Sequence, residues 1–375
     1  MTFLMVCTGT AGHINPGLCI ADEIKDRLPE AKIIFVGADR PLEQRLIPAA
    51  RYELVNIKMS GIKRGIKPSD IIHNIKTVIN VLSAKTKVKK LLKNTKPNAV
   101  IGTGGYICYP VLKTAAAMKV PTFIHESNAK PGMTVKMLSG IVDKVMIAFE
   151  GYDEYYKKPD RLVLTGTPLR REFYSPDEDN LQTQQDNKQE IKPLIVSFWG
   201  SLGAERMNDI MAGFVKSNLM KNSFYHTHGA GNSFNILIDK LAQYGITKTE
   251  PPYADIREYI EDMPVVMKKA DLVLCRAGAI SIAELLALGK PSILVPSQYV
   301  PDNVQGENAK QLEKLGAAVV LDEESSTAEI LFEKAIELIS DKEKLNKMAL
   351  AAKKLKAPNA TSDIVDLILK DTGAQ

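Results

Sequence analysis

The chain has 375 residues, more than one hydrophobic core usually supports, so two domains are expected. Hydrophobic residues make up 45% and charged residues 25% of the chain, which is the ordinary composition of a globular protein. The net charge of +5 is uneven, because residues 1–165 hold 25 Lys and Arg against 14 Asp and Glu, whereas the remainder holds 24 against 30.

The first half alternates between predicted strands and helices. The apolar run Leu4–Cys7 has no basic leader of the kind found in signal peptides and predicts a first strand. A helix near Pro16–Leu28 follows, then a strand over Ile33–Val36, and later a strand over Ala99–Ile101 before another helix. This alternation is typical of βαβ units in a parallel sheet.

The pattern restarts after the polar stretch Asp177–Lys192, which we interpret as a solvated linker or loop. The elements predicted beyond it are a strand over Leu194–Ser197, a turn over Gly200–Ala204, a helix over Glu205–Lys216, and strands over Leu272–Cys275 and Ser292–Val295. The sequence therefore predicts an α/β fold of two Rossmann-like, doubly wound domains hinged near Arg161–Pro193. Ligands should bind at the carboxyl ends of the strands, in the interdomain cleft.

The lengths of the apolar runs and the spacing of the cysteines bear on membrane insertion and on the redox compartment. The longest apolar runs, such as Pro291–Pro296, are far shorter than the roughly 20 residues of a membrane-spanning helix. The four cysteines are scattered without Cys-x-x-Cys spacing, which favours buried free thiols in a reducing compartment, such as the cytoplasm, over disulfides or a zinc site.

Much of the positive charge lies between Lys58 and Lys96, where ten Lys and Arg64 accompany one acid, Asp70. No aromatic platform or nucleic-acid motif accompanies this stretch, so an anionic lipid surface is the better partner. The periodic apolar residues of Met59–Leu82 are compatible with either lipid contact or core packing.

Three predicted strands end in glycine-rich turns, at Thr8–His13, Gly102–Tyr106 and Gly200–Ala204. Glycine allows a sharp turn and a close approach of a phosphate or sugar to the backbone amides, next to the positive end of the following helix. None ends in Gly-Lys-Ser/Thr, which excludes a P-loop, and none is a full dinucleotide-binding motif. Each turn alone is also compatible with a plain strand-to-helix connection.

A fourth strand end, Cys275–Glu284, places small residues at a turn and an acid about two helical turns later. A carboxylate there could accept both hydroxyls of a ribose, although an ion-paired helix acid would look the same. Downstream, Pro301–Ala309 offers amides and carboxylates suited to sugar hydroxyls or to capping a helix.

Taken in order, these motifs resemble the MurG family of UDP-N-acetylglucosamine:N-acetylmuramyl-(pentapeptide) pyrophosphoryl-undecaprenol N-acetylglucosaminyltransferases. The resemblance runs from the first strand to about Leu321. The segments that carry it are Thr8–Pro16, Gly102–Tyr106, His125–Gly132, Thr165–Arg170, Gly200–Ala204, Arg276–Ala279 and Asp302–Ala309.

The resemblance implies the GT-B fold, with residues 1–165 as an acceptor- and membrane-binding domain and residues 166–355 as the UDP-sugar-binding domain. Residues 356–375 would pack back on the first domain. It implies inverting transfer of N-acetylglucosamine from UDP-N-acetylglucosamine to the C4 hydroxyl of the muramyl sugar of undecaprenyl-linked lipid I, which makes lipid II for peptidoglycan. No metal or other cofactor and no nucleic acid is implied, and the enzyme would be peripheral on the cytoplasmic face of the cell membrane.

The resemblance also assigns roles by matching position. For the donor, Glu284 would hold the ribose, Ser201 and Arg170 the diphosphate, Asn128 and Gln305 the N-acetylglucosamine, and the backbone around Ile260 and Met263 the uracil. For the acceptor, the matching residues are Thr10, Gly12, His13, Gly104, Gly105 and Tyr106. His13 would be either the general base or a ligand of the acceptor diphosphate.

Some positions depart from the family pattern. Thr8, Ala11 and Tyr109 stand where glycine is usual and are expected to line the acceptor face. Phe198 and Trp199 precede Gly200, and Val304 replaces a glutamine of some members. The acceptor is therefore less certain than the donor. The alternatives are a diacylglycerol glycosyltransferase, a nucleotide-sugar epimerase of the same fold, and a non-catalytic paralogue.

Overall fold

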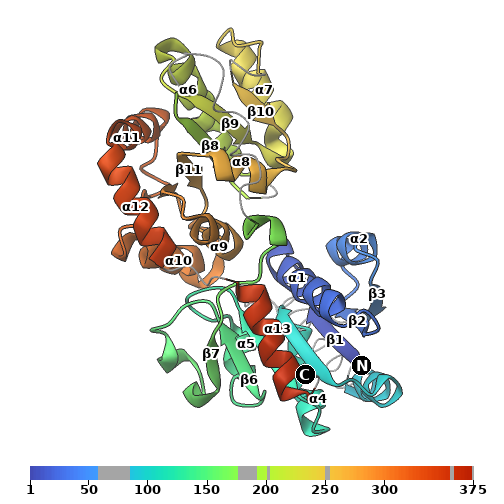
Figure 1. Ribbon diagram of the computed structural model, residues 1–375. Helices are drawn as coiled ribbons and strands as arrows, with labels where there is room; N and C mark the ends of the chain where they lie inside the picture. The colour runs from blue at the N-terminus through green and yellow to red at the C-terminus, as the bar shows by residue number, and fades with distance from the viewer. Residues whose placement is uncertain (58–84, 176–191, 201–202, 250–253, 355–358, 374–375) are drawn as a thin grey trace, which may run out of the picture. The chain divides into compact units, whose positions relative to one another are not determined.

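The computed structural model describes residues 1–57, 85–175, 192–200, 203–249, 254–354 and 359–373 (Figure 1). The stretch Met59–Leu82, most of the polar stretch Asp177–Lys192, and Ser201 lie outside these residues. The chain divides into two units, Met1–Leu169 with Asn359–Gln375, and Arg170–Pro358. We call these unit 1 and unit 2. Each contains one parallel sheet, which confirms the predicted α/β class.

Unit 1 contains a seven-stranded sheet in the order β3-β2-β1-β4-β5-β6-β7. Its strands are β1 (Thr2–Cys7), β2 (Lys32–Gly37), β3 (Glu53–Asn56), β4 (Ala99–Gly104), β5 (Thr122–Glu126), β6 (Lys144–Ile147) and β7 (Leu162–Leu164). Its helices are α1 (Ala11–Arg27), α2 (Pro41–Ala49), α4 (Cys108–Ala117), α5 (Met133–Leu138) and α13 (Ala360–Asp371). Residues 85–95 are also helical.

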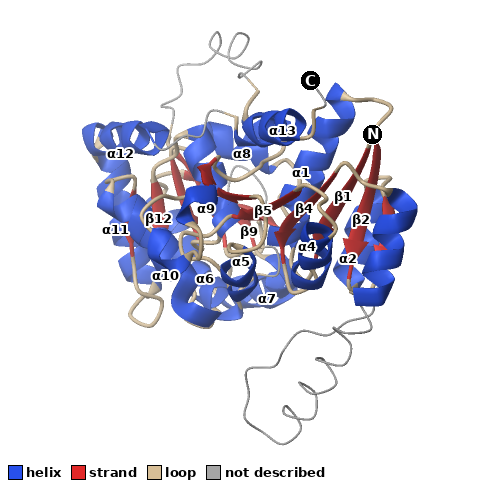
Figure 2. Cartoon of the chain, turned by 90° about the horizontal axis from the view of Figure 1, so that it is seen from below, coloured by secondary structure: helices blue, strands red, loops and turns tan. Residues whose placement is uncertain are grey.

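Alternate residues of the strands fill two separate cores, because successive side chains of a strand point to opposite faces. Leu4 and Val6 of β1 pack with α4 on one face, whereas Phe3 and Met5 pack with α1 and α13 on the other. Figure 2 shows α1 and α13 on one side of these strands and α4 on the other. The sheet is therefore covered on both faces, as parallel sheets usually are.

The last helix of the chain completes unit 1. The apolar side chains of α13, among them Ile364, Val365 and Ile368, are fully buried in the core that contains Phe3 and Met5. Thr361 donates a hydrogen bond to the carbonyl of Leu169 (3.1 Å), and α13 lies beside α1 (Figure 1). The first and last segments of the chain thus form one core.

Unit 2 contains a six-stranded sheet in the order β10-β9-β8-β11-β12-β13. Its strands are β8 (Leu194–Phe198), β9 (Tyr225–Gly229), β10 (Asp255–Arg257), β11 (Leu272–Cys275), β12 (Ser292–Leu294) and β13 (Ala318–Val320). Its α-helices are α6 (Glu205–Lys221), α7 (Phe234–Gln243), α8 (Met263–Lys269), α9 (Ala279–Leu288), α10 (Val304–Lys314), α11 (Ala328–Ser340) and α12 (Lys342–Lys354).

One core of unit 2 lies between the sheet and the helices α6, α11 and α12, where Phe214, Phe224 and Phe332 stack within 6 Å of one another. All four cysteines of the chain are buried and free, as their spacing predicted. No helix among the described residues has the length and apolar character needed to cross a bilayer.

Candidate functional site

In unit 1 the two glycine-rich turns of the first half meet at the switch point of the sheet. Strands β1 and β4 are neighbours, and the connections that leave them lead to opposite edges of the sheet. The amide of Thr8 donates to the carbonyl of Gly104 (3.3 Å), which joins the two turns. Open α/β sheets usually bind ligands at this position, outside the carboxyl ends of the strands.

His13 lies in the first turn of α1 and is held against the second turn. Its Nδ1 is 2.8 Å from the carbonyl oxygen of Thr8. A carbonyl can only accept, so Nδ1 carries the proton and Nε2 of the neutral ring has a lone pair. The ring covers Gly104, whose φ is +126° and where an added Cβ would lie 2.3 Å from Cδ2 of His13. Only glycine leaves room for the imidazole at this point.

The first turn of α1 has the features of an anion site. Thr10 is the N-cap residue but makes no side-chain cap hydrogen bond, and the first turn contains no acidic residue. Thr10 and Gly9 are exposed. Uncapped amides at the start of a helix attract anions such as phosphate. The acceptor residues expected from the sequence, Thr10, Gly12, His13, Gly104, Gly105 and Tyr106, all lie on these two neighbouring turns.

A buried acid that sequence reasoning missed, Glu43 of α2, holds the first turn in place. Its side chain is fully buried and accepts hydrogen bonds from the hydroxyl of Thr8, the amide of Gly9 (3.1 Å) and the amide of Ala38 (2.7 Å). The amide of Arg40 donates to it as well (3.3 Å). A carboxylate that accepts several hydrogen bonds is a strong anchor for a loop.

The expectation that Thr8 lines the acceptor face is wrong. Its side chain is fully buried, because the hydroxyl donates to Glu43 and the methyl group packs under Gly105. Tyr109 is half-buried against the core on the α4 side, and its hydroxyl accepts from Lys113 (3.0 Å). On the neighbouring turn, Tyr106 lies beside Arg40, whose Nε donates to its hydroxyl (3.3 Å).

The segment after β5 is fixed by two buried side chains. His125 Nε2 donates to the carbonyl of Gly166 (2.8 Å), and burial lowers the pKa of His125 to about 4, so this imidazole is neutral. Glu126 accepts from the backbone and side-chain amides of Asn128 (3.0 and 2.9 Å) and from the amide of Gly132 (2.8 Å). Asn128 is therefore held with its side chain oriented by Glu126.

In unit 2 the switch point lies between β8 and β11. The turn after β8 contains Gly200 and Gly203, both with positive φ, and ends at Ala204, the N-cap residue of α6. The turn after β11 ends at Gly278, the N-cap residue of α9, and that helix has neither a side-chain cap nor an acid in its first turn. The start of α9 therefore offers free amides to an anion.

Glu284 of α9 and Arg170 are electrostatically linked. The protein packed around Glu284 raises the pKa of its carboxyl to about 7, and the guanidinium of Arg170 acts in the opposite direction. Arg170 is exposed and lies over the ring of Phe173 (5.7 Å). A strongly shifted carboxyl beside a cation at the carboxyl edge of a sheet is typical of a binding or catalytic position.

The side-chain carboxamides of two residues of α10, Gln305 and Asn308, form hydrogen bonds with neighbouring turns. The amide of Ser297 donates to Oε1 of Gln305 (2.8 Å), so the carboxamide of Gln305 is oriented by the turn after β12. Asn308 is fully buried and donates to the carbonyl of Ala277 (3.1 Å), which locks α10 to the turn after β11. Gln305 thus lies on a helix that is joined to the turn that contains Gly278.

The residues expected near the uracil follow β10. Ile260 is only 2% exposed and its side chain packs on Gly229, so this side chain is not available to a ligand. Met263 begins α8 and is half-buried. The amides of Ala230 and Gly231 donate to the carbonyls of Arg257 and Glu258 (2.9 and 2.8 Å), which joins the ends of β9 and β10.

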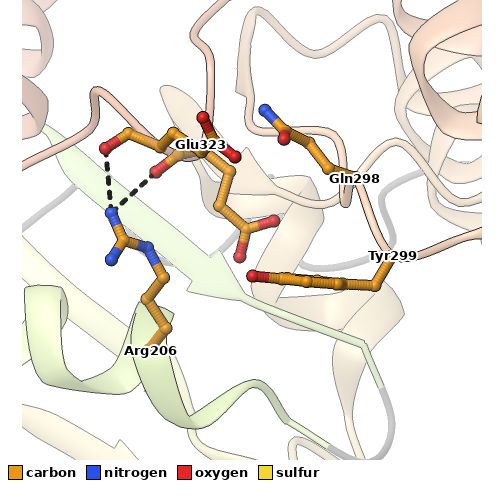
Figure 3. A pocket seen from close by; sticks show the side chains of 5 residues that line it. Arg206, Gln298, Tyr299 and Glu323 are labelled. Carbon is orange, nitrogen blue, oxygen red and sulfur yellow. Dashed lines mark hydrogen bonds between the residues drawn. The ribbon is translucent and has the colours of Figure 1, made fainter.

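Farther along the same edge lies a small cavity of about 140 Å³, lined by Arg206, Gln298, Tyr299, Glu323 and Glu324 (Figure 3). Arg206 donates from one nitrogen to the carbonyls of Glu323 and Glu324 (3.1 and 3.0 Å). The carboxylate of Glu323 is buried and pairs with Arg276 (2.6 Å). These bonds fix the turn after β13. Among the described residues, no three His, Cys, Asp or Glu side chains are grouped as a metal site requires.

The chain is similar to known glycosyltransferases over both of its units. Residues 3–147 match the glycosyltransferase family 28 N-terminal domain, and residues 194–364 match the family 28 C-terminal domain. A UDP-N-acetylglucosamine--N-acetylmuramyl-(pentapeptide) pyrophosphoryl-undecaprenol N-acetylglucosamine transferase of Acetivibrio thermocellus is 41% identical over 96% of this chain and 95% of that protein. The transferase of the same name from Clostridioides difficile is 36% identical over 99% of this chain and 89% of that protein.

Among solved structures, MurG of Acinetobacter baumannii aligns with a TM-score of 0.75 at 26% identity and covers 98% of this chain and 99% of that one. A UDP-GlcNAc 2-epimerase from Neisseria meningitidis, solved with UDP-GlcNAc bound, aligns with a TM-score of 0.65 at 17% identity and covers 99% of this chain and 100% of that one. The second likeness shows the fold alone.

Proposed function

Because the chain belongs to the MurG family of glycosyltransferase family 28, with the GT-B fold of two Rossmann-like domains, we propose that it transfers N-acetylglucosamine from UDP-N-acetylglucosamine to lipid I. The product would be lipid II for peptidoglycan synthesis. The observation that carries this proposal is the 41% identity to a transferase of this name over 96% of the chain. Similarity of this extent includes both the acceptor-side and the donor-side turns.

For the donor, unit 2 supplies the groups that a UDP-sugar requires. The Glu284 carboxylate would accept the two ribose hydroxyls, and the uncapped start of α9 would receive the diphosphate with help from Arg170. The carboxamide of Gln305, oriented by Ser297, would bind the sugar, and the backbone around Ile260 and Met263 would read the uracil. Ser201 would contact the diphosphate, and Asn128 of unit 1, oriented by Glu126, would contact the N-acetylglucosamine.

For the acceptor, unit 1 supplies a base and an anion site. The C4 hydroxyl of the muramyl sugar would attack the anomeric carbon of N-acetylglucosamine as the bond to the UDP oxygen breaks. His13 Nε2 would take the hydroxyl proton, because Nδ1 is already protonated toward Thr8. UDP would leave with negative charge that the α9 amides and Arg170 stabilise. The acceptor diphosphate would bind the start of α1, near Thr10, Gly12, Gly104, Gly105 and Tyr106.

For localisation, we propose peripheral attachment to the cytoplasmic face of the cell membrane through unit 1. The helical residues 85–95 expose Lys85, Lys87, Lys89, Lys90 and Lys93, while Val88 and Leu92 of the same helix are buried in the core. Such a basic face is attracted to anionic lipids, with about 1 kcal/mol for each lysine near the surface.

The proposal is tested by transfer of labelled N-acetylglucosamine from its UDP donor to a short-chain lipid I analogue. Diacylglycerol and acceptor-free reactions run alongside, because a diacylglycerol glycosyltransferase would use the former and an epimerase would act in the latter. We expect a disaccharide product with lipid I alone, and its loss in Glu284→Ala and His13→Ala. Nucleotide binding without transfer to any acceptor would contradict the proposal and indicate a non-catalytic paralogue.

A further inference from the structure

Four buried polar side chains form a continuous chain of hydrogen bonds inside unit 2. Ser197 comes from β8, His226 and His228 from β9, and Asn208 from α6, and none is more than 4% exposed. Ser197 Oγ lies 2.8 Å from His226 Nε2 and 2.7 Å from His228 Nδ1, and His228 Nε2 lies 3.1 Å from Asn208 Oδ1. Polar groups are costly to bury, so such a chain calls for an explanation.

Asn208, the last member of this hydrogen-bond chain, determines which group donates and which accepts in every bond of it. Asn208 Nδ2 donates to the carbonyl of Ala230 (2.8 Å), so Asn208 Oδ1 must accept from His228 Nε2. His228 Nδ1 then accepts from the hydroxyl of Ser197, and that hydroxyl accepts from His226 Nε2. His228 must be neutral for the chain to exist, because its Nδ1 accepts a hydrogen bond while its Nε2 donates one.

The carbonyl of Ala230, where the chain ends, lies between the two turns expected to bind the nucleotide. A Cβ on Gly203, after β8, would lie 2.2 Å from this carbonyl oxygen, so Gly203 packs directly on it. On the other side, the amides of Ala230 and Gly231 hold the carbonyls of Arg257 and Glu258, just before Ile260. The segment 229–231 thus joins Gly203 to the segment after β10.

We propose that the hydrogen-bond chain from His226 through Ser197 and His228 to Asn208 positions the segment 229–231, and through it Gly203 before the start of α6, for binding the uridine diphosphate of the donor. His228 and Asn208 are then positioning residues for the donor. The inference rests on the proposed function, because it takes Gly203 with the start of α6 and the segment after β10 as parts of the donor site.

Asn218 provides a matched control on the same helix. Like Asn208, it is a buried asparagine of α6, and its Nδ2 donates to a backbone carbonyl beside β9, that of Phe224 (2.9 Å). Phe224, however, precedes β9, at the edge of the sheet opposite the turns. Asn208→Ala and Asn218→Ala therefore each remove one buried amide from α6, at opposite ends of the helix. Comparable losses of melting temperature are expected for both.

The readout is UDP affinity, measured by the fluorescence of Trp199, the single tryptophan of the chain, which directly precedes Gly200. We expect Asn208→Ala to raise the Kd for UDP at least about tenfold, because a displaced binding loop loses its geometry, and Asn218→Ala to leave it unchanged. In transfer assays, Asn208→Ala should raise the KM for UDP-N-acetylglucosamine and leave the KM for the lipid I analogue unchanged.

A second pair of variants distinguishes a positioning role from a general loss of stability. This test can still be made if Asn208→Ala does not fold. His228→Gln keeps a donor near the Nε2 position for Asn208, whereas His228→Phe fills the space without one. UDP affinity should be largely retained in His228→Gln and lost in His228→Phe. Equal Kd values for Asn208→Ala and Asn218→Ala, or for the two His228 variants, would overturn the inference. Failure of the wild type to bind UDP would instead refute the proposed function.

Discussion

The imidazole of His13 lies on the α-carbon of Gly104, so closely that a Cβ at position 104 would be 2.3 Å from the ring. Gly104→Ala should therefore displace His13 and reduce kcat by about 100-fold or more, because a shift of about 1 Å in a reacting group has effects of this size. Steady-state kinetics with the lipid I analogue measure the loss.

Gly151→Ala is the control for this substitution, since Gly151 also has a positive φ (+84°) but has no atom within 4 Å of an added Cβ. It should destabilise the protein by about 1 kcal/mol and leave kcat unchanged. A Gly104→Ala enzyme with the kcat of the wild type would show that the position of His13 does not limit the reaction.

Glu284→Gln should stabilise the protein at pH 8 and weaken donor binding. The pKa of Glu284 is raised from 4.5 to about 7 by burial, so the folded protein holds a proton that the unfolded chain loses as the pH rises through 4.5. Above pH 7 the charge of this half-buried carboxylate destabilises the fold, and glutamine avoids this charge. The difference in melting temperature between the variant and the wild type should increase from pH 5 to pH 8. The expected increase is about 2–4 °C for each kcal/mol of destabilisation that the substitution removes.

The same carboxylate would accept the ribose hydroxyls, so UDP affinity of the wild type should increase as the pH rises through about 7. Calorimetric titration of UDP between pH 5.5 and pH 8.5 measures this. Glu343→Gln, which changes an exposed acid on α12, should alter neither property. A wild-type affinity independent of pH in this range would contradict the role given to Glu284.

Glu43→Gln should unfold the first glycine turn of unit 1 and lower the stability of the protein. Glutamine keeps only one accepting oxygen, and its NH2 group would face two of the donors that surround Glu43, namely the hydroxyl of Thr8 and the amides of Gly9, Ala38 and Arg40. A loss on the order of 3 kcal/mol is expected in urea unfolding, as for other buried, hydrogen-bonded charges. Glu53→Gln, at an exposed ion pair with Lys32, should change the stability by less than about 1 kcal/mol.

Mild acid should destabilise unit 2 through its buried histidines. Burial lowers the pKa of His228 to about 4 and that of His226 well below its ordinary value of 6.5. The unfolded chain therefore takes up protons below pH 6.5 that the folded protein does not, and stability falls as the pH decreases toward 4. His226→Phe, which packs among Phe214 and Phe224, should lose roughly 2 kcal/mol less than the wild type between pH 6.5 and pH 5. Urea unfolding at both pH values gives the comparison, and equal losses would argue against a neutral His226.

The fold was largely predictable because its strands are short and strongly apolar. The strand predicted over Leu272–Cys275 is β11 to the residue, and β1 extends the predicted Leu4–Cys7 by two residues. The start of α1 was placed too late, near Pro16, because proline favours the first turn of a helix. The helix begins at Ala11 and contains Pro16 in its interior.

The residues of the candidate site could be predicted only where they come shortly after the end of a predicted strand. The turns with His13 and Gly104, and the helix with Glu284, were predicted in this way. Glu43 was missed because its partners, Thr8 and Gly9, are more than 30 residues away in the sequence, and a single glutamate in a helix carries no signal of such a bond. For the same reason Thr8 was expected to line the acceptor face, although it is buried and its hydroxyl donates a hydrogen bond to Glu43. The roles of Ser197, His226 and His228 depend on strand pairing, which residue types alone do not reveal.

The packing of α13 into the core of unit 1 has a consequence for the synthesis of the protein. The residues of unit 1 that leave the ribosome first lack Ile364, Val365 and Ile368, which fill one of its two cores. Unit 2 lies between these two parts of the chain and is translated completely before α13 exists. The part of the protein that is translated first therefore completes its folding last, and the apolar side chains that α13 later covers are exposed during translation, where a ribosome-associated chaperone could bind them.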